Sequence, residues 1–283
     1  MYRLIKGLGH ALCRLSPTAL DRWAAVLARL SFDVLRIRRR MILRNLTIAF
    51  GDTYTAAERV RLGRASFKHF YLTAFEFLRA TGTNVLADTD QEGLEYVTAA
   101  LAEGKGAYVL TCHLGNWEVM GAAGAHFATT VNALVKEIGS GGANRLVDEL
   151  RRKMGWVPIY RKPEGTALKA ILAALKRNEL VGFMLDQARP GAPRIPFFGT
   201  PAKTLTSLAA IWRKYPRPII PVSIHRLAPC RHHAKAWPPL MPVRTDDAKQ
   251  DVLNLTAECN RMIEQMIRET PEQYFWMHNR WKA

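Results

Sequence analysis

His113 and Glu118 lie in the segment TCHLGNWE, which directly follows the apolar run AYVL. A carboxylate bonded to one ring nitrogen of a histidine fixes its tautomer and raises the basicity of the other nitrogen, which suits a general base acting on a hydroxyl. We expect His113 to close a strand, with Gly115 and Asn116 opening a helix whose first turn brings Glu118 to the imidazole. Amides at that helix N-terminus can steady a developing oxyanion. The spacing alone fits a structural histidine as well.

Cys112, beside His113, suggests a second chemistry, that of a nucleophilic thiol. Neighbouring side chains on a strand point to opposite faces, so the thiol and the imidazole should not share one site. We therefore expect Cys112 to be a small buried side chain.

A metal centre is the third chemistry to consider, because histidines and a cysteine cluster at 225–233. Their spacing matches no strong ligand pattern, and the sequence contains no CxxC or HExxH. The four cysteines are widely spaced, which also argues against a disulfide framework. We expect no metal and no cofactor.

Alternating strands and helices must position these residues. From about residue 95 onward, short apolar runs alternate with helical stretches, which predicts an α/β fold with a sheet covered on both faces. Sites in such sheets gather where strands end, and Asp186 ends one run as His113 ends another. The expected strands are 107–112, 129–135, 156–160, 180–185 and 218–225, and the expected helices between them include 144–154 and 165–178.

Residues 1–80 differ from the rest in pattern and charge. They contain several expected helices, with Ser16 or Thr18 as a possible cap, and residues 1–70 hold 14 Lys/Arg against 4 Asp/Glu. No apolar run here has the length of a signal-peptide core or a membrane span. We predict a helical, membrane-associating region over 1–80 and a catalytic domain over 81–283, although an ordinary amphipathic helix packed on the core fits the pattern too.

The formal charge of +17 implies an anionic partner, which could be a nucleic acid, an anionic membrane surface or an acidic carrier protein. No nucleic-acid-binding motif is recognisable, which argues against the first. Arg151 and Arg152 fit either a solvated helix face or an anion site. The apolar segment 195–212 fits core packing or an acyl channel, and we expect the aromatic C-terminal segment to dock on the body.

Taken together, several ordered segments resemble the lipid A biosynthesis acyltransferases of the lauroyl/myristoyl type, within the wider lysophospholipid acyltransferase group. HLGNWE is similar to the HxxxxE/D motif of that family. The other matching segments, which span nearly the whole chain, are RRRMILRNLTIAF, ANRLVDELRRKMG, MLDQARPGAPRIPFFGTPAKT, PIIPVSIHR and QYFWMHNRWK.

The resemblance implies transfer of a fatty acyl group from an acyl carrier protein thioester to a hydroxyl of a membrane lipid, foremost a lipid A precursor. Another glycolipid or phospholipid acceptor, or thioester hydrolysis, is the alternative. It also implies a mixed or mostly parallel sheet like that of glycerolipid acyltransferases, an anionic membrane lipid as partner, and peripheral or monotopic attachment at the cytoplasmic face of the bacterial inner membrane. The resemblance implies no metal, no cofactor and no nucleic-acid partner.

The resemblance also implies residue roles. His113 would deprotonate the acceptor hydroxyl, and Glu118 would be its orienting carboxylate. Substrate-binding roles are implied for the other matched residues, which are Arg151, with Arg152 as the competing assignment, Asp186 and Asn116.

Overall fold

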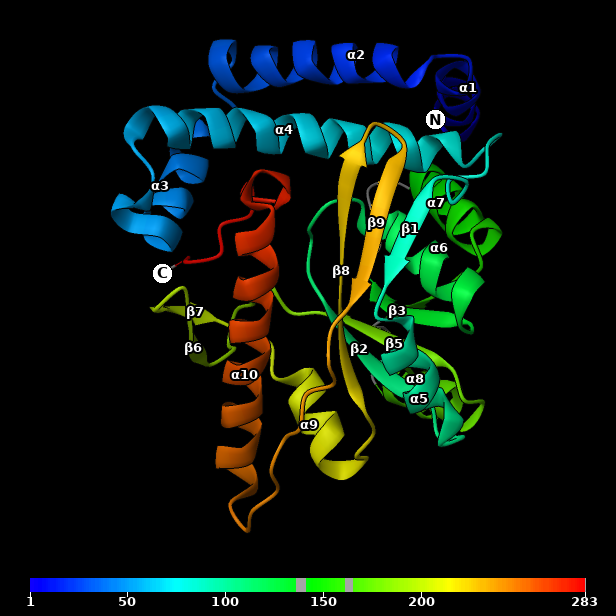
Figure 1. Cartoon of the computed structure of the whole chain (residues 1–283), viewed down its shortest axis with the longest axis vertical. Coiled ribbons are helices and arrows are strands. Elements are labelled where there is room, and N and C mark those ends of the chain that lie inside the picture. Colours follow the sequence, from blue (N-terminus) through cyan, green and yellow to red (C-terminus); the bar gives the residue numbers. More distant parts are fainter. Residues whose placement is uncertain (136–140, 161–164, 283) are drawn as a thin grey trace.

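A seven-stranded sheet lies at the centre of the protein (Figure 1), whose computed structural model describes residues 1–135, 141–160 and 165–282. Every neighbouring pair in this sheet is parallel except the β8–β9 hairpin, which confirms the predicted mostly parallel α/β sheet. Across the sheet the strands are β1 (Thr89–Glu92), β9 (Arg231–Ala236), β8 (Ile219–Ala228), β2 (Ala107–Thr111), β5 (Leu180–Met184), β3 (Val131–Val135) and β4 (Trp156–Tyr160). A separate antiparallel pair comprises β6 (Arg194–Phe197) and β7 (Thr200–Lys203).

Helices cover both faces of the sheet, as its apolar strands require. Strand β2 shows the division, because Tyr108 and Leu110 pack in one buried cluster while Ala107 and Val109 pack in another. The first cluster includes residues of α8 (Thr166–Lys176), α9 (Ser207–Lys214) and α10 (Ala248–Glu269). The second lies beneath α5 (Leu94–Ala102) and α6 (Trp117–Phe127), with α7 (Gly141–Lys153) beside them.

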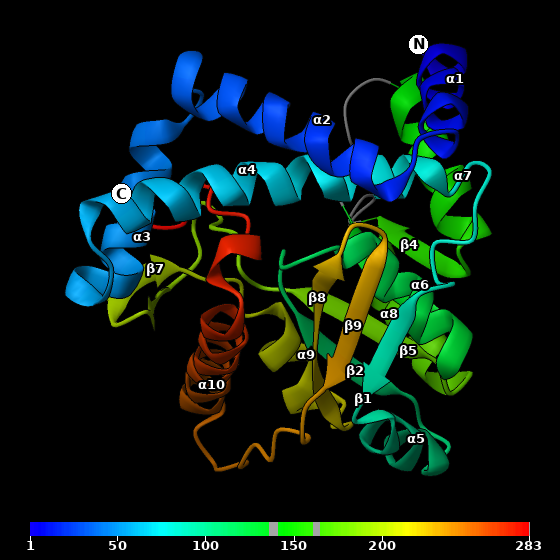
Figure 2. The same cartoon turned by 45° about the horizontal axis from the view of Figure 1, so that its top comes forward.

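The N-terminal region, residues 1–80, is helical, as predicted. Its α-helices are α1 (Tyr2–Cys13), α2 (Pro17–Arg29), α3 (Arg39–Phe50) and α4 (Ala56–Arg79). Ser16 caps α2 by accepting from the Ala19 amide at 3.2 Å, as the sequence suggested. Helix α2 lies along α4 in both views (Figures 1 and 2), and it buries Leu20 and Ala24 there. None of the described helices combines the length and apolar character needed to cross a membrane.

The C-terminal segment docks on the body, as predicted. Tyr274 and Trp276 are buried, and the Asn45 amide of α3 donates to the carbonyl oxygens of Trp276 at 2.9 Å and His278 at 2.8 Å. The Phe275 amide donates to the His113 carbonyl at 3.0 Å. The C-terminal segment therefore connects α3 with the turn that follows β2.

Candidate active site

The register between β2 and β5 brings His113 and Asp186 together. Thr111 pairs with Met184 at the ends of these parallel strands, and the two ionisable residues follow two positions later in each chain segment. The Nδ1 atom of His113 lies 2.9 Å from Oδ1 of Asp186, and the backbone amide of His113 donates to Oδ2 at 3.1 Å. Asp186 is therefore the carboxylate that holds the imidazole.

The protonation of this pair follows from the surroundings of Asp186. Burial raises its pKa, but the charge of His113, the hydrogen bonds from His113 and the charge of Arg280 outweigh burial and hold the pKa below its usual value. A carboxylate can only accept a hydrogen bond, so Nδ1 donates to Asp186, and in the neutral imidazole Nε2 is the nitrogen with the free electron pair. The side-chain nitrogen of Gln187 lies 3.3 Å from this Nε2 atom.

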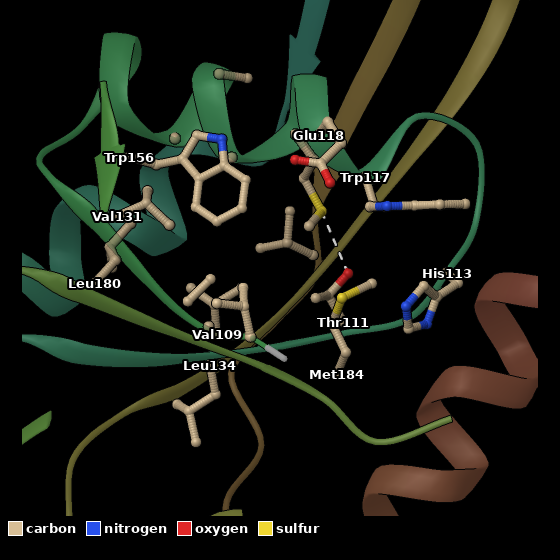
Figure 3. A pocket seen from close by; sticks show the side chains of 18 of the residues that line it. Val109, Thr111, His113, Trp117, Glu118, Val131, Leu134, Trp156, Leu180 and Met184 are labelled. Carbon is tan, nitrogen blue, oxygen red and sulfur yellow. Dashed lines mark hydrogen bonds between the residues drawn. The ribbon is translucent and has the colours of Figure 1, made fainter. Parts of the chain in front are cut away.

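The expectation that Glu118 orients His113 is wrong. Arg151 binds the Glu118 carboxylate through two hydrogen bonds, from Nη2 at 2.7 Å and from Nε at 3.1 Å. Helix α6 begins at Trp117, whose ring packs against the imidazole with centroids 5.1 Å apart. The next residue of a helix points about 100° away, so Glu118 faces Arg151 instead. In Figure 3 the Trp117 ring lies between Glu118 and His113.

Asn116 shapes the turn and is not among the residues that line the pocket described below, so the structure does not place it at the expected substrate-binding position. The Asn116 side chain is fully buried, accepts from the Val119 amide at 3.3 Å and donates to Glu76 at 2.8 Å. The preceding Gly115 has a positive φ of 57°, and a Cβ atom there would lie 2.1 Å from the Ile224 carbonyl oxygen. Only glycine fits this position.

An apolar pocket of about 670 Å³ opens beside His113. Alternate residues of the strands form its floor, because side chains two apart share one face of a sheet. Helix α6 covers it, and Figure 3 shows Trp156, Val131 and Leu180 at the end away from His113. The floor residues include Val109, Thr111, Leu180, Gly182, Met184, Val131 and Ala133.

The two candidate arginines, Arg151 and Arg152, differ in burial and in their position relative to the pocket. Arg151 is buried and lines the pocket together with Glu118, and its guanidinium lies 4.7 Å from the Trp156 ring centroid. Arg152 is exposed. The structure therefore favours Arg151 as the residue of this block that can act at the site.

Cys112 faces the core, as strand alternation predicted. It is 2% exposed, and burial raises the pKa of its thiol well above the usual value. Phe197 and Phe198 of the 195–212 segment are also buried in the main core and do not line the pocket, which favours the packing interpretation of these two aromatics.

The histidines at 225–233 have other partners. His225 and His233 stack with ring centroids 5.0 Å apart, and His233 contacts Glu92 at 3.1 Å. His232 lies 3.4 Å from Glu76. Within residues 1–135, 141–160 and 165–282, no group of three or more histidine, cysteine or acidic residues is arranged to hold a metal ion.

Sequence comparison relates the whole chain to known proteins. A family model for bacterial lipid A biosynthesis acyltransferases matches residues 3–283. Lipid A biosynthesis palmitoleoyltransferase of Escherichia coli (strain K12) is 26% identical over 262 residues, which cover 88% of this chain and 80% of that protein. Lipid A biosynthesis acyltransferase of Shigella flexneri has the same identity and coverage.

The Glu118–Arg151 pair yields a prediction about stability. Replacing one partner, as in Glu118→Leu or Arg151→Met, leaves an unpaired buried charge and should lower the free energy of unfolding by about 3–5 kcal/mol. The double variant removes both charges, so urea unfolding should show that it loses at least about 1 kcal/mol less than the sum of the single losses.

The exposed pair Arg231–Asp90 provides the control. Arg231→Met should cost no more than about 1 kcal/mol, because solvent screens that pair. Strictly additive losses for Glu118→Leu and Arg151→Met would contradict the coupling.

Proposed function

Because the chain belongs to the bacterial lipid A biosynthesis acyltransferase family, we propose that it transfers a fatty acyl chain from an acyl carrier protein thioester to a hydroxyl of a lipid A precursor. One observation carries the proposal: the His113–Asp186 pair lies beside an apolar pocket of about 670 Å³. A base that can activate a hydroxyl thus adjoins a cavity that suits an aliphatic chain.

The proposed reaction proceeds by direct transfer. The acceptor hydroxyl displaces the Gln187 amide, donates its proton to Nε2 of His113 and attacks the thioester carbonyl. A carbon–oxygen bond forms, the carbon–sulfur bond breaks, and the imidazolium returns the proton to the leaving thiolate. Asp186 holds the ring in place and stabilises its transient positive charge, as the carboxylate does in catalytic triads.

The pocket would hold the acyl chain. Its lining is mainly apolar, and the buried charges of Glu118 and Arg151 in its wall neutralise each other. Trp156 would limit the chain at the far end (Figure 3). Gly182 leaves space in the floor, because a Cβ atom there would meet nothing closer than the Asn132 carbonyl oxygen at 3.7 Å.

An acidic acyl carrier protein suits the charge of the surface. Arg189 follows Gln187 by two residues and lines the same pocket, so it can meet a carrier that delivers its thioester to His113. The net charge of +17 would favour the encounter over long distance.

The N-terminal helices would bind the cytoplasmic surface of the bacterial inner membrane peripherally. On α2, Leu20 and Ala24 face α4, whereas Trp23 and Val26 lie on the outer face and are 56% and 54% exposed. Basic residues surround this apolar surface, a combination that favours anionic lipid. The exposed apolar residues of this region include Leu4, Leu8, Trp23, Val26, Leu30, Val34, Leu35 and Ile37, and its exposed arginines include Arg3, Arg14, Arg22, Arg29, Arg36, Arg38 and Arg40.

The first test follows label from an acyl carrier thioester into a lipid A precursor. The wild type should form acylated lipid, His113→Ala should abolish transfer, and Asp186→Asn should reduce kcat on the order of 10³- to 10⁴-fold because the tautomer is lost. Free fatty acid without lipid product would instead indicate a hydrolase. Full activity of His113→Ala would refute the mechanism.

The second test concerns chain length. Gly182→Ala and Gly182→Val fill the pocket floor in two steps, so kcat/KM should shift progressively toward shorter acyl chains. Each methylene of the acyl chain that can no longer be buried in the pocket should cost about 0.8 kcal/mol of binding free energy. A panel of carrier thioesters measures the ratio of long-chain to short-chain kcat/KM, which general loss of stability leaves unchanged. An equal fall for all lengths would mean that the chain lies elsewhere.

The third test concerns membrane binding. The double substitution Trp23→Asp with Val26→Asp should weaken binding to anionic phospholipid vesicles at least about tenfold, since each apolar side chain buried is worth about 1.5–3 kcal/mol. Val243→Asp replaces an exposed valine outside this region and should bind like the wild type. Equal vesicle affinity for the double variant and the control would rule out this surface.

A further inference from the structure

A buried ion pair lies behind the turn formed by residues 113–116, here called the catalytic turn. Arg226 of β8 binds Glu76 of α4 through Nη2 at 2.6 Å and Nε at 2.8 Å, and both side chains are 2% exposed. Neither residue lines the pocket. The pair is therefore outside the reacting site while lying close to it.

The Glu76 carboxylate has a full set of donors. It accepts from the Cys230 amide at 3.0 Å and from the Asn116 side chain at 2.8 Å, in addition to Arg226. Burial raises the pKa of Glu76, but Arg226 outweighs it and lowers the pKa to about 2, so the group is a carboxylate. Buried pairs of this kind are often no more stabilising than apolar residues, whereas they do fix geometry.

The neighbouring histidines add no charge. Burial and the charge of Arg226 lower the pKa of His69 to about 3, and burial lowers that of His232 to about 4. Neutral His69 can accept a hydrogen bond from Arg226, whose Nη1 atom lies 2.7 Å from its Nδ1 atom. The cluster therefore contains one anion and one cation, surrounded by neutral polar groups.

Thr73 links this ion pair to the catalytic turn. Its hydroxyl donates to the Gly115 carbonyl at 2.9 Å and accepts from Arg226 at 3.2 Å. On the other side, the Gly115 amide donates to the Gln273 carbonyl at 3.2 Å, while the Gln273 side chain binds both backbone groups of Arg226. The peptide groups on both sides of Gly115 are thus tied to α4 and β8.

We propose that Glu76 and Arg226 are positioning residues that act through Thr73 and Asn116 to hold the catalytic turn, and with it His113, in register with Asp186. The inference rests on the acyl transfer proposed above. Because His113 directly precedes the Leu114–Gly115 step, a shift of the turn moves the imidazole relative to both substrates. Displacements of about 1 Å can cost on the order of 10²-fold in rate.

Thr73→Val tests the link, because it keeps the side-chain shape and removes the hydroxyl. We expect kcat to fall roughly 10- to 100-fold with KM for the carrier thioester unchanged, since the pocket is untouched. Thr73→Ser restores the hydroxyl and should recover most of kcat. Amides of residues 114–119 should exchange hydrogen faster in Thr73→Val, an observation that needs no activity.

Thr256→Val is the matched control. Thr256 is also buried, but its hydroxyl donates only within α10, to the Val252 carbonyl. It should keep wild-type kcat and wild-type exchange at residues 114–119. Should Thr73→Val fail to fold, Asn116→Ser replaces it, because serine still caps α6 while the bond to Glu76 is lost.

Three results would overturn the proposal: wild-type kcat in Thr73→Val, an equal loss in Thr256→Val, or no recovery in Thr73→Ser. All three presuppose a wild type that transfers acyl groups and a His113→Ala variant that does not. A wild type that transfers no acyl group would refute the proposed function instead. Hydrogen exchange does not need activity, so exchange at residues 114–119 that is the same in Thr73→Val as in the wild type would refute the positioning role by itself.

Discussion

The parallel register between β2 and β5 is the constraint on which the site depends. A slip of one residue would turn Val109 and Leu110 to the wrong faces of a sheet that is buried on both sides, so core packing enforces the register. The same register sets His113 opposite Asp186 just beyond the strand ends. The contact between the base and its carboxylate is thus fixed by the burial of apolar strands, and the loops need only support it.

Segments distant in sequence complete that support. The Phe275 amide donates to the His113 carbonyl, and the buried Tyr274 side chain lies near the Asp186 carboxylate, so that burial and this charge raise the pKa of Tyr274. The Ala188 amide donates to Nε2 of His278 at 2.9 Å, and burial lowers the pKa of His278, which keeps this nitrogen an acceptor. Asn45 in turn holds the C-terminal segment. The matched motifs at the two ends of the chain are therefore parts of one structure around the β2 and β5 ends.

The pattern of apolar residues in the sequence predicted those features of the fold that depend only on which side chains are buried. The apolar runs located the central strands, with the bounds of β4 at 156–160 as expected, and alternation placed Cys112 in the core. The pattern missed β1 and β9, because TDQE and RHHAKA are polar strands at one edge of the sheet. It could not assign the partners of Glu118 or Asp186, which depend on the start of α6 and on the strand register. The division at residue 80 stays a prediction.

Charge pairing explains why Asp186 and not Glu118 holds the base. A buried guanidinium cannot lose its proton, so Arg151 requires a full anion, and Glu118 supplies it through two hydrogen bonds. Turning Glu118 toward His113 would leave that cation unpaired at a cost of several kcal/mol. An imidazole can stay neutral when buried, and it needs only one acceptor to fix its tautomer. Asp186 supplies that one acceptor. Glu118 instead neutralises Arg151, so the two residues add no net charge to the wall of the apolar pocket.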